Sequence, residues 1–369
     1  MSPIFAGTLK RFAAVMLFVV AVHSIVIAQN ADLKLLDWQP NSQIVVHATE
    51  VRYPKFPVID IHNHLGELEN MKHYLAQMDS ARVWIAISLD GLSKKDFYKE
   101  HLKASQTLAP QRLLVFFAPE WEKIDEPNFG INEAKRLHEA YKAGVRGVKV
   151  FKSLGLTVKD KTGKVVPVDD PRLDPIWAKC GELHIPVMIH VSDPKAFFTP
   201  VDSHNERYDE LAEHPEWAFV GDKYPGKEEI LDQRNRVLAK HPNTIFIGAH
   251  MGNLPEDLGR VALWLDQYPN FYVDIDARIN ELGRQPYTTR KFMIRYQDRV
   301  LFGTDKSPDA ASYRVYYRFL ETDDEYFDTE PANGQQGRWM IYGLYLPDEV
   351  LEKVYNKNAL RILKMHEGK

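Results

Sequence analysis

Eight short apolar segments, separated by longer stretches with helical periodicity, are the feature that most restricts the fold of this 369-residue chain. The segments are rich in β-branched and aromatic residues, so we expect them to be strands. They span residues 58–61, 82–87, 113–117, 147–151, 186–189, 244–248, 271–275 and 300–302. Several are apolar on both faces, which is typical of parallel strands that are covered by helices.

Helical patterns lie between these segments, at residues 132–143, 174–183, 228–240, 256–267 and 288–295. Strands that alternate with helices over this length predict an α/β protein, and the favoured architecture is a (β/α)8 TIM barrel. A doubly wound open sheet is the alternative. The sequence lacks a G-x-G-x-x-G motif after the first strand, which weakens that alternative.

Two longer segments interrupt the alternation: residues 192–226 follow the fifth strand, and residues 306–345 follow the eighth. Loops after barrel strands open at the C-terminal face, where active sites form. We therefore predict loop insertions that cover a site at this face. For 306–345, which is rich in aromatic residues, a contact between subunits of a homo-oligomer is the alternative.

The N-terminus has the pattern of a secretory signal. Lys10 and Arg11 precede a nearly unbroken apolar run, residues 12–28. We predict a signal peptide over 1–28, an N-terminal extension over 29–56 and the barrel over 57–369. The protein is then exported, periplasmic or secreted, with no stable membrane insertion after cleavage. An uncleaved anchor is the alternative.

Charge and cysteine content exclude several classes of protein. The 47 basic and 51 acidic residues give a formal net charge of −4 without a long run of one sign, so nucleic acid is not an expected partner. The single cysteine, Cys180, excludes disulfides within the chain and cysteine-rich metal clusters. We expect Cys180 to be a buried residue of a helix.

Polar side chains follow four of the predicted strands. His62 and His64 lie two residues apart after the first strand, His190 follows the fifth, His250 the sixth and Asp305 the eighth. A spacing of two puts both imidazoles of the first strand on one face, and all strand ends of a barrel meet at one mouth. Imidazole and carboxylate groups together favour a divalent metal, for which we expect zinc, and a small-molecule substrate.

With these motifs, residues 55–365 resemble the amidohydrolase superfamily, in particular its amidohydrolase-2 branch of metal-dependent hydrolases and decarboxylases. The resemblance rests on the His-x-His pair, His190, His250 and the triplet Gly303-Thr304-Asp305. It implies a barrel with one or two metal ions at the C-terminal mouth. It also implies His62, His64, His190 and Asp305 as ligands, and His250 as a second-metal ligand or a catalytic base.

The fourth strand bears on the number of metal ions. In binuclear members of the superfamily a carbamylated lysine at this strand bridges two ions, and Lys149 resembles that residue. Lys152 is the rival candidate, and a lysine that only faces solvent or an acidic partner is the third interpretation. Mononuclear members lack the bridging lysine, so one and two ions both remain open.

The expected activity is hydrolysis of a small ester, lactone or amide by a metal-activated water. A bound metal lowers the pKa of its water from about 15.7 toward about 7. Asp305 is expected to accept the proton, and His250 or the metal to polarise the substrate carbonyl. The first alternative is non-oxidative decarboxylation of an aromatic or unsaturated carboxylic acid. The second is a non-catalytic exported barrel that binds a metal or a carbohydrate.

Three further residues are candidates for substrate binding. Arg278 follows the seventh strand, where a guanidinium can hold a carboxylate, although Asp274 and Asp276 are competing partners. Glu120 follows the third strand, and Lys306 directly follows Asp305.

Overall fold

The computed structural model describes residues 33–365 except 35–36, 39, 91–96 and 331–335. It divides into two units, Met1–Val45 and Val46–Lys369. In the first unit the described residues are exposed, and the predicted signal peptide lies outside the described residues. None of the described helices is long and apolar enough to cross a membrane.

The described residues of the second unit form eight parallel strands. They are β1 (Val58–Asn63), β2 (Val83–Ser88), β3 (Leu113–Val115), β4 (Val148–Val150), β5 (Val187–Ile189), β6 (Phe246–Gly248), β7 (Phe271–Asp274) and β8 (Val300–Leu301). Strands β1–β3 and β4–β8 pair in sequence order. Parallel bridges Phe117–Val148 and Asn63–Lys306 join the two groups at both edges. The ring is therefore closed, which confirms the (β/α)8 barrel and excludes the open sheet.

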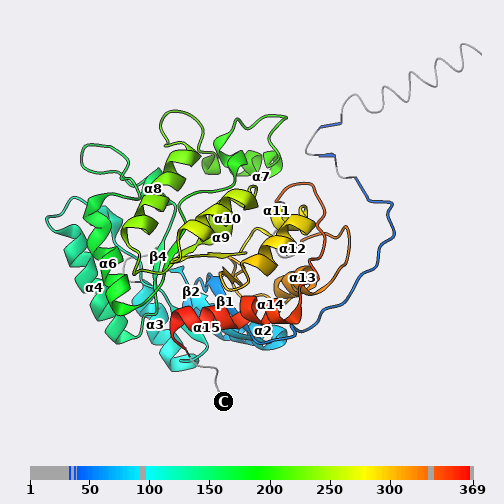
Figure 1. Cartoon of the computed structure of the whole chain (residues 1–369), viewed down its shortest axis with the longest axis horizontal. Helices are drawn as coiled ribbons and strands as arrows, with labels where there is room; N and C mark the ends of the chain where they lie inside the picture. Colours follow the sequence, from blue (N-terminus) through cyan, green and yellow to red (C-terminus); the bar gives the residue numbers. More distant parts are fainter. Residues whose placement is uncertain (1–32, 35–36, 39, 91–96, 331–335, 366–369) are drawn as a thin grey trace, which may run out of the picture. The chain divides into compact units, whose positions relative to one another are not determined.

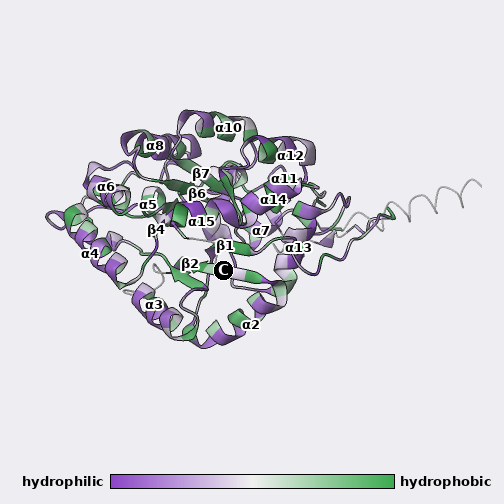
Figure 2. Ribbon diagram, turned by 60° about the horizontal axis from the view of Figure 1, so that its bottom comes forward, coloured by the Kyte–Doolittle hydropathy of each residue, from purple (hydrophilic) through white to green (hydrophobic). Residues whose placement is uncertain are grey.

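Helices surround the strands (Figures 1 and 2). The longer ones are α2 (Met71–Ala81), α3 (Phe97–Leu108), α4 (Phe129–Ala143), α6 (Asp174–Leu183), α8 (Lys227–Lys240), α10 (Leu258–Gln267), α12 (Pro286–Arg295) and α13 (Ala310–Glu321). The shorter ones are α5 (Ser153–Leu156), α7 (Tyr208–Glu213), α9 (Ala249–Gly252), α11 (Ile279–Gly283), α14 (Asp348–Glu352) and α15 (Asn358–Leu363). The five predicted helices are confirmed as α4, α6, α8, α10 and α12. Their ends follow local chemistry: α6 begins with Asp174 and Pro175, and α4 is followed directly by Gly144, whose φ is 122°.

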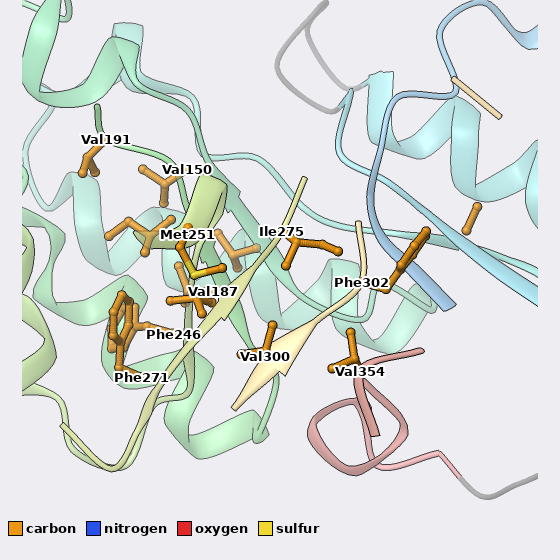
Figure 3. Close-up of a cluster of buried hydrophobic side chains, with 14 of the residues drawn as sticks. Val150, Val187, Val191, Phe246, Met251, Phe271, Ile275, Val300, Phe302 and Val354 are labelled. Atoms are coloured by element: carbon orange, nitrogen blue, oxygen red, sulfur yellow. The ribbon is translucent and has the colours of Figure 1, made fainter. Parts of the chain in front are cut away.

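Side chains alternate between two hydrophobic layers. The barrel interior holds Ile59, Ile61, Ile85, Ile87, Leu114, Phe116, Met188, Ile247 and Leu301, and α15 adds Leu360 and Leu363 to this cluster. The layer between strands and helices includes Val150, Val187, Phe246, Phe271 and Val300 (Figure 3). Because Lys149 pairs in register with Met188, its side chain faces the barrel interior among apolar neighbours.

The two predicted insertions differ. Residues 192–226 contain the short helix α7 and line a cavity above the strand ends. Residues 306–345 are not one long loop, because they include α13, the outer helix that follows β8. Tyr313, Tyr316, Tyr317 and Phe319 of α13 are buried in the core. These aromatic residues of α13 therefore pack in the core and do not cover the site, whereas Gln336 of the same segment lines the cavity.

Candidate active site

The carboxyl ends of the strands bring the five predicted polar residues together. His62 Nε2 and His64 Nε2 lie 3.1 Å and 3.0 Å from the same atom, Asp305 Oδ1. His190 Nδ1 lies 3.3 Å from His250 Nε2, and His250 Nε2 lies 3.9 Å from Asp305 Oδ2. The cluster thus joins residues from the ends of β1, β5, β6 and β8.

The backbone at this cluster is unusual. Asp305 has a φ of 61°, and the neighbouring residues His250 and Met251 have φ values of 56° and 55°. Left-handed conformations are costly for residues other than glycine, and they concentrate at functional sites. Gly303 has a different role: a Cβ added there would lie 2.9 Å from His62 Cβ, so the glycine leaves room for the imidazole.

Buried carboxylates hold the outer nitrogen of three imidazoles. His64 Nδ1 lies 2.6 Å from Asp90 Oδ1. Asp276 Oδ2 lies 2.9 Å from both His62 Nδ1 and His250 Nδ1. A histidine whose Nδ1–H is held by a carboxylate presents the lone pair of Nε2. These contacts therefore turn the Nε2 atoms of His62, His64 and His250 toward the centre of the cluster.

Sequence reasoning missed these supporting carboxylates. Asp274 and Asp276 were considered only as alternative partners of Arg278. In the structure Asp276 contacts His62 and His250, and Asp274 Oδ2 lies 3.0 Å from His62 Nδ1. Their spacing of two at the end of β7 was the available signal. For Asp90, its position just after β2 was the signal.

The donor set fits a divalent metal ion. His62, His250, Asp276 and Asp305 offer donor atoms that all lie within 4.8 Å of one another. In addition, His190 Nε2 is buried without a hydrogen-bond partner among the described residues. Burial acts to raise the pKa of Asp305, but His62 and His64 hold it well below its usual value. Asp305 is thus a carboxylate, as a metal ligand must be.

Lys149 rather than Lys152 lies inside the barrel. Lys149 Nζ is 2.9 Å from His62 Nε2, and burial lowers the pKa of this lysine. Lys152 Nζ is 2.6 Å from Asp193 Oδ2 and forms an ion pair with it. Lys149 is therefore the lysine placed to reach a metal ion. A bridging role for it stays a prediction.

A cavity of about 580 Å³ opens above the cluster. Its wall includes His64, Lys149, His190, His250, Asp305 and Arg278, together with Phe197, Trp217 and Phe219 of the 192–226 segment. Arg278 is only 6% exposed. Its guanidinium donates to the Ala277 carbonyl at 2.6 Å and has no ion-pair partner among the described residues. Burial lowers the pKa of Arg278, but nearby negative charges, led by Glu281 and Asp193, raise it by more, so the net shift is upward. The cavity wall therefore carries a fixed positive charge.

Two predicted substrate-binding residues lie elsewhere. Glu120 Oε1 pairs with Arg136 at 3.0 Å, and Lys123 pairs with its other oxygen. The backbone carbonyl of Lys306 accepts a hydrogen bond from His64 N at 3.1 Å. Neither residue is among the described residues that line the cavity.

Comparison with known proteins gives a family and a fold. The family model described as Amidohydrolase matches residues 125–365. No curated protein matches the chain. Among solved structures, 2,6-dihydroxybenzoate decarboxylase from Rhizobium is similar, with a TM-score of 0.52, 17% identity, and coverage of 84% of this chain and 99% of that one.

Two further solved structures have the same fold. A dihydroxybenzoic acid decarboxylase from a Polaromonas species, solved with manganese and the inhibitor 2-nitroresorcinol, has a TM-score of 0.53 and 16% identity, covering 84% of this chain and 97% of that one. A 5-carboxyvanillate decarboxylase from Sphingomonas paucimobilis has a TM-score of 0.51 and 12% identity, covering 85% of this chain and all of that one.

These structures correct the expected reaction. Hydrolysis of an ester, lactone or amide is contradicted, because the similar structures with a stated activity are mostly aromatic-acid decarboxylases. The histidine and aspartate motifs do not separate the two reactions, since both use the same donor set, and so the motifs alone misled. Zinc is likewise not specifically supported, whereas a divalent metal is.

The family model covers most of the barrel, and the closed ring of strands carries the histidine and aspartate cluster at its C-terminal mouth. The chain belongs to the amidohydrolase family and is an enzyme of that superfamily.

Proposed function

We propose that this protein is a metal-dependent, non-oxidative decarboxylase of an aromatic carboxylic acid. The observation that carries the proposal is Arg278, a buried guanidinium that forms no ion pair with any described residue, in the same cavity wall as Asp305 and His250. Such a group is suited to bind a carboxylate through charge-assisted hydrogen bonds. The activities of the similar solved structures support the same substrate class.

The rest of the cavity suits a flat aromatic ring. Phe151, Phe197, Trp217 and Phe219 line it, and aromatic side chains contact a ring through stacked or edge-to-face geometry. Its volume of about 580 Å³ is within the range of small-molecule sites. We propose Mn²⁺ or Zn²⁺ as the metal. His62, His64, His190 and Asp305 are the proposed ligands.

The reaction needs a proton at the ring carbon that bears the carboxylate. The bond from that carbon to the carboxylate then breaks, its electron pair returns to the ring, and CO₂ leaves, so that no oxidant is required. We assign proton transfer to Asp305 and His250, which are 3.9 Å apart and both line the cavity. Because Asp305 rests as a carboxylate, this pair first takes up a proton from solvent and then passes it to the ring carbon. When bound, the metal supplies a Lewis acid that withdraws electron density from the substrate oxygen atoms. Arg278 holds the acid in the cavity until the bond breaks.

The test uses manganese-loaded protein and a panel of mono- and dihydroxybenzoic acids, with CO₂ release and the phenolic product as readouts. We expect turnover of at least one acid. We expect Arg278→Met to lower kcat/KM about 10- to 150-fold, the loss of one hydrogen bond to a charged group. Arg278→Lys should lose less, because the charge remains.

The matched control is Arg295→Met, because Arg295 pairs with Asp266 at 2.9 Å and is not among the described cavity residues. This variant should retain the wild-type kcat/KM. Absence of CO₂ release from every acid, with metal bound stoichiometrically, contradicts the proposed function. Equal kcat/KM for Arg278→Met and wild type contradicts the role of Arg278.

A further inference from the structure

We propose that Phe219 determines the length of substrate that the enzyme accepts, because its ring separates the active-site cavity from a second cavity. The inference rests on the proposed function only for the substrate class, an aromatic acid. The second cavity measures about 480 Å³ and is lined by Phe198, Tyr224 and Lys227, among others. Phe219 lines both cavities.

The ring of Phe219 has neighbours from both sides. Lys152 Nζ, which belongs to the active-site cavity, lies 5.5 Å from the centre of the ring. The rings of Phe198 and Tyr224, which belong to the second cavity, lie 5.5 Å and 5.2 Å from it. Since Phe219 is only 8% exposed, its ring fills the space between these groups and forms part of the wall.

The rest of the wall is held by contacts that do not use this ring. The turn Lys195–Phe198 contributes Phe197 to the active-site cavity and Phe198 to the second cavity. The backbone N–H of Phe219 donates to the Phe197 carbonyl at 2.7 Å. Lys227 Nζ donates to the Asp193 carbonyl and, at 2.6 Å, to the Asn253 carbonyl. Truncation of the Phe219 side chain therefore opens the wall and leaves these ties in place.

Two cavities that share one aromatic side chain in their walls have a direct consequence for specificity. With the ring present, an aromatic acid bound at the metal cluster meets Phe219 when a second, fused ring extends toward this side of the cavity. Without the ring, the fused ring extends between Phe198 and Tyr224. One methylene in an apolar pocket changes discrimination about 10- to 200-fold, so the loss of a whole phenyl ring is readily measured.

The experiment measures binding, so it does not depend on turnover. The probes are 2-nitrophenol and 1-nitro-2-naphthol, which carry a nitro group in place of the carboxylate and cannot lose CO₂. Dissociation constants are measured by calorimetry on manganese-loaded wild type and on Phe219→Ala. We expect 2-nitrophenol to bind both proteins about equally, and 1-nitro-2-naphthol to bind Phe219→Ala at least about tenfold more tightly than wild type.

Phe198→Ala is the matched control, because it removes a neighbouring phenyl ring that lines only the second cavity. It should leave the affinity for 1-nitro-2-naphthol at the wild-type value. If Phe219→Ala does not fold, Phe219→Leu replaces it in the measurement. Its affinity for 1-nitro-2-naphthol should rise in the same direction, but by less. The proposal is overturned if wild type binds the bicyclic probe as tightly as the variant, if the variant does not bind it, or if Phe198→Ala gains the same affinity.

The two proposals fail separately. Absence of decarboxylation by wild type and by every variant overturns the proposed function, while the dissociation constants still decide the role of Phe219. Conversely, decarboxylation of single-ring acids by wild type with no gain of bicyclic binding in Phe219→Ala overturns only the role of Phe219.

Discussion

At the scale of single residues, one carboxylate oxygen organises the centre of the site. Asp276 Oδ2 lies 2.9 Å from Nδ1 of His62, at the end of β1, and 2.9 Å from Nδ1 of His250, directly after β6. The backbone N–H of His250 also donates to Asp276 Oδ1 at 2.9 Å. The hydrogen-bond partner of His62 Nδ1 is Asp274 Oδ2 at 3.0 Å, and that of His250 Nδ1 is the Asp276 backbone carbonyl at 3.2 Å. The Asp276 carboxylate adds a negative charge in contact with the outer nitrogen of both rings. Asp276 is therefore a positioning residue for both.

This role predicts a loss of metal affinity in Asp276→Asn. An asparagine retains the size of the side chain but loses the charge that favours Nδ1–H on both histidines. We expect manganese affinity to fall about 10- to 100-fold, as is usual for partners of metal-binding histidines. The measurement is competition with a chelating dye.

The control for this prediction is Asp209→Asn, since Asp209 pairs with Arg338 and is not among the described residues that line the cavity. It should retain the wild-type metal affinity. A dissociation constant for manganese in Asp276→Asn that equals the wild-type value would refute the positioning role, whatever happens to the melting temperature.

The sequence predicted those site residues that follow an apolar strand. His190, His250 and Asp305 each come directly after such a run, and parallel strands bring their ends together. Glu120 also follows a strand, but Arg136 of α4 takes one of its carboxylate oxygens, and nothing in the pattern indicates that partner. Position after a strand therefore predicts proximity to the site, but it does not predict which group a side chain contacts.

At the scale of elements, the hydrophobic periodicity of the sequence predicted most of the strands and helices. One segment, residues 306–345, was misinterpreted. In α13, Tyr313, Tyr316, Tyr317 and Leu320 follow the spacing of a buried helical face and are buried. The segment was expected to be an aromatic-rich loop, although this spacing indicated a helix. In β4, Val148 and Val150 belong to the layer under the helices and Lys149 faces the barrel interior, as the alternation of a strand requires. The sequence pattern alone had also allowed Lys152 or a lysine that faces solvent.

Helix α8 also ties down the loops that carry the site. Lys227 Nζ donates to carbonyls in the segments after β5 and β6, and burial lowers its pKa from 10.5 to about 8. The neutral amine still has two N–H donors for these two carbonyls. Between pH 8 and 10.5 the unfolded chain holds more protons at this lysine than the folded protein does, so stability rises with pH in this range.

The prediction is that this rise is absent in Lys227→Met. Relative to the variant, the wild-type free energy of unfolding should increase by about 2 kcal/mol between pH 7 and pH 9.5. Urea unfolding of both proteins at each pH gives the difference. Lys240→Met, which removes a lysine of the same helix that pairs with Asp174, should show no such increase. A difference that does not change with pH would show that the pKa of Lys227 is not lowered.

At the scale of the whole molecule, ion pairs join the 192–226 segment to other parts of the chain. Arg207 pairs with Glu281 of α11, Glu206 pairs with Arg284 at 2.8 Å, and Asp209 pairs with Arg338. The first of these pairs is buried. The cover over the cavity is thus held to the regions that follow β7 and β8, and not only to its own strand ends.

Metal binding should also be visible in global stability. The ligands come from distant parts of the chain, so the folded protein binds the ion and the unfolded chain does not. At a manganese concentration of one hundred times the dissociation constant, stability should rise by about 2.7 kcal/mol. Thermal unfolding with manganese and with a chelator measures this, and Asp305→Asn should lose most of the rise. Equal melting temperatures with and without manganese in wild type would contradict a metal centre.

Strand β1 pairs with the segment that follows β8, so the metal site forms only after both ends of the barrel have been synthesised. His64 and Asp305, whose side chains lie 3.0 Å apart, are separated by 241 positions in the chain. During synthesis on the ribosome, the two halves of the ligand set therefore emerge far apart in time. The nascent polypeptide cannot capture an ion with the complete set until nearly all of the barrel has been made, and the choice of metal is left to the environment in which folding finishes.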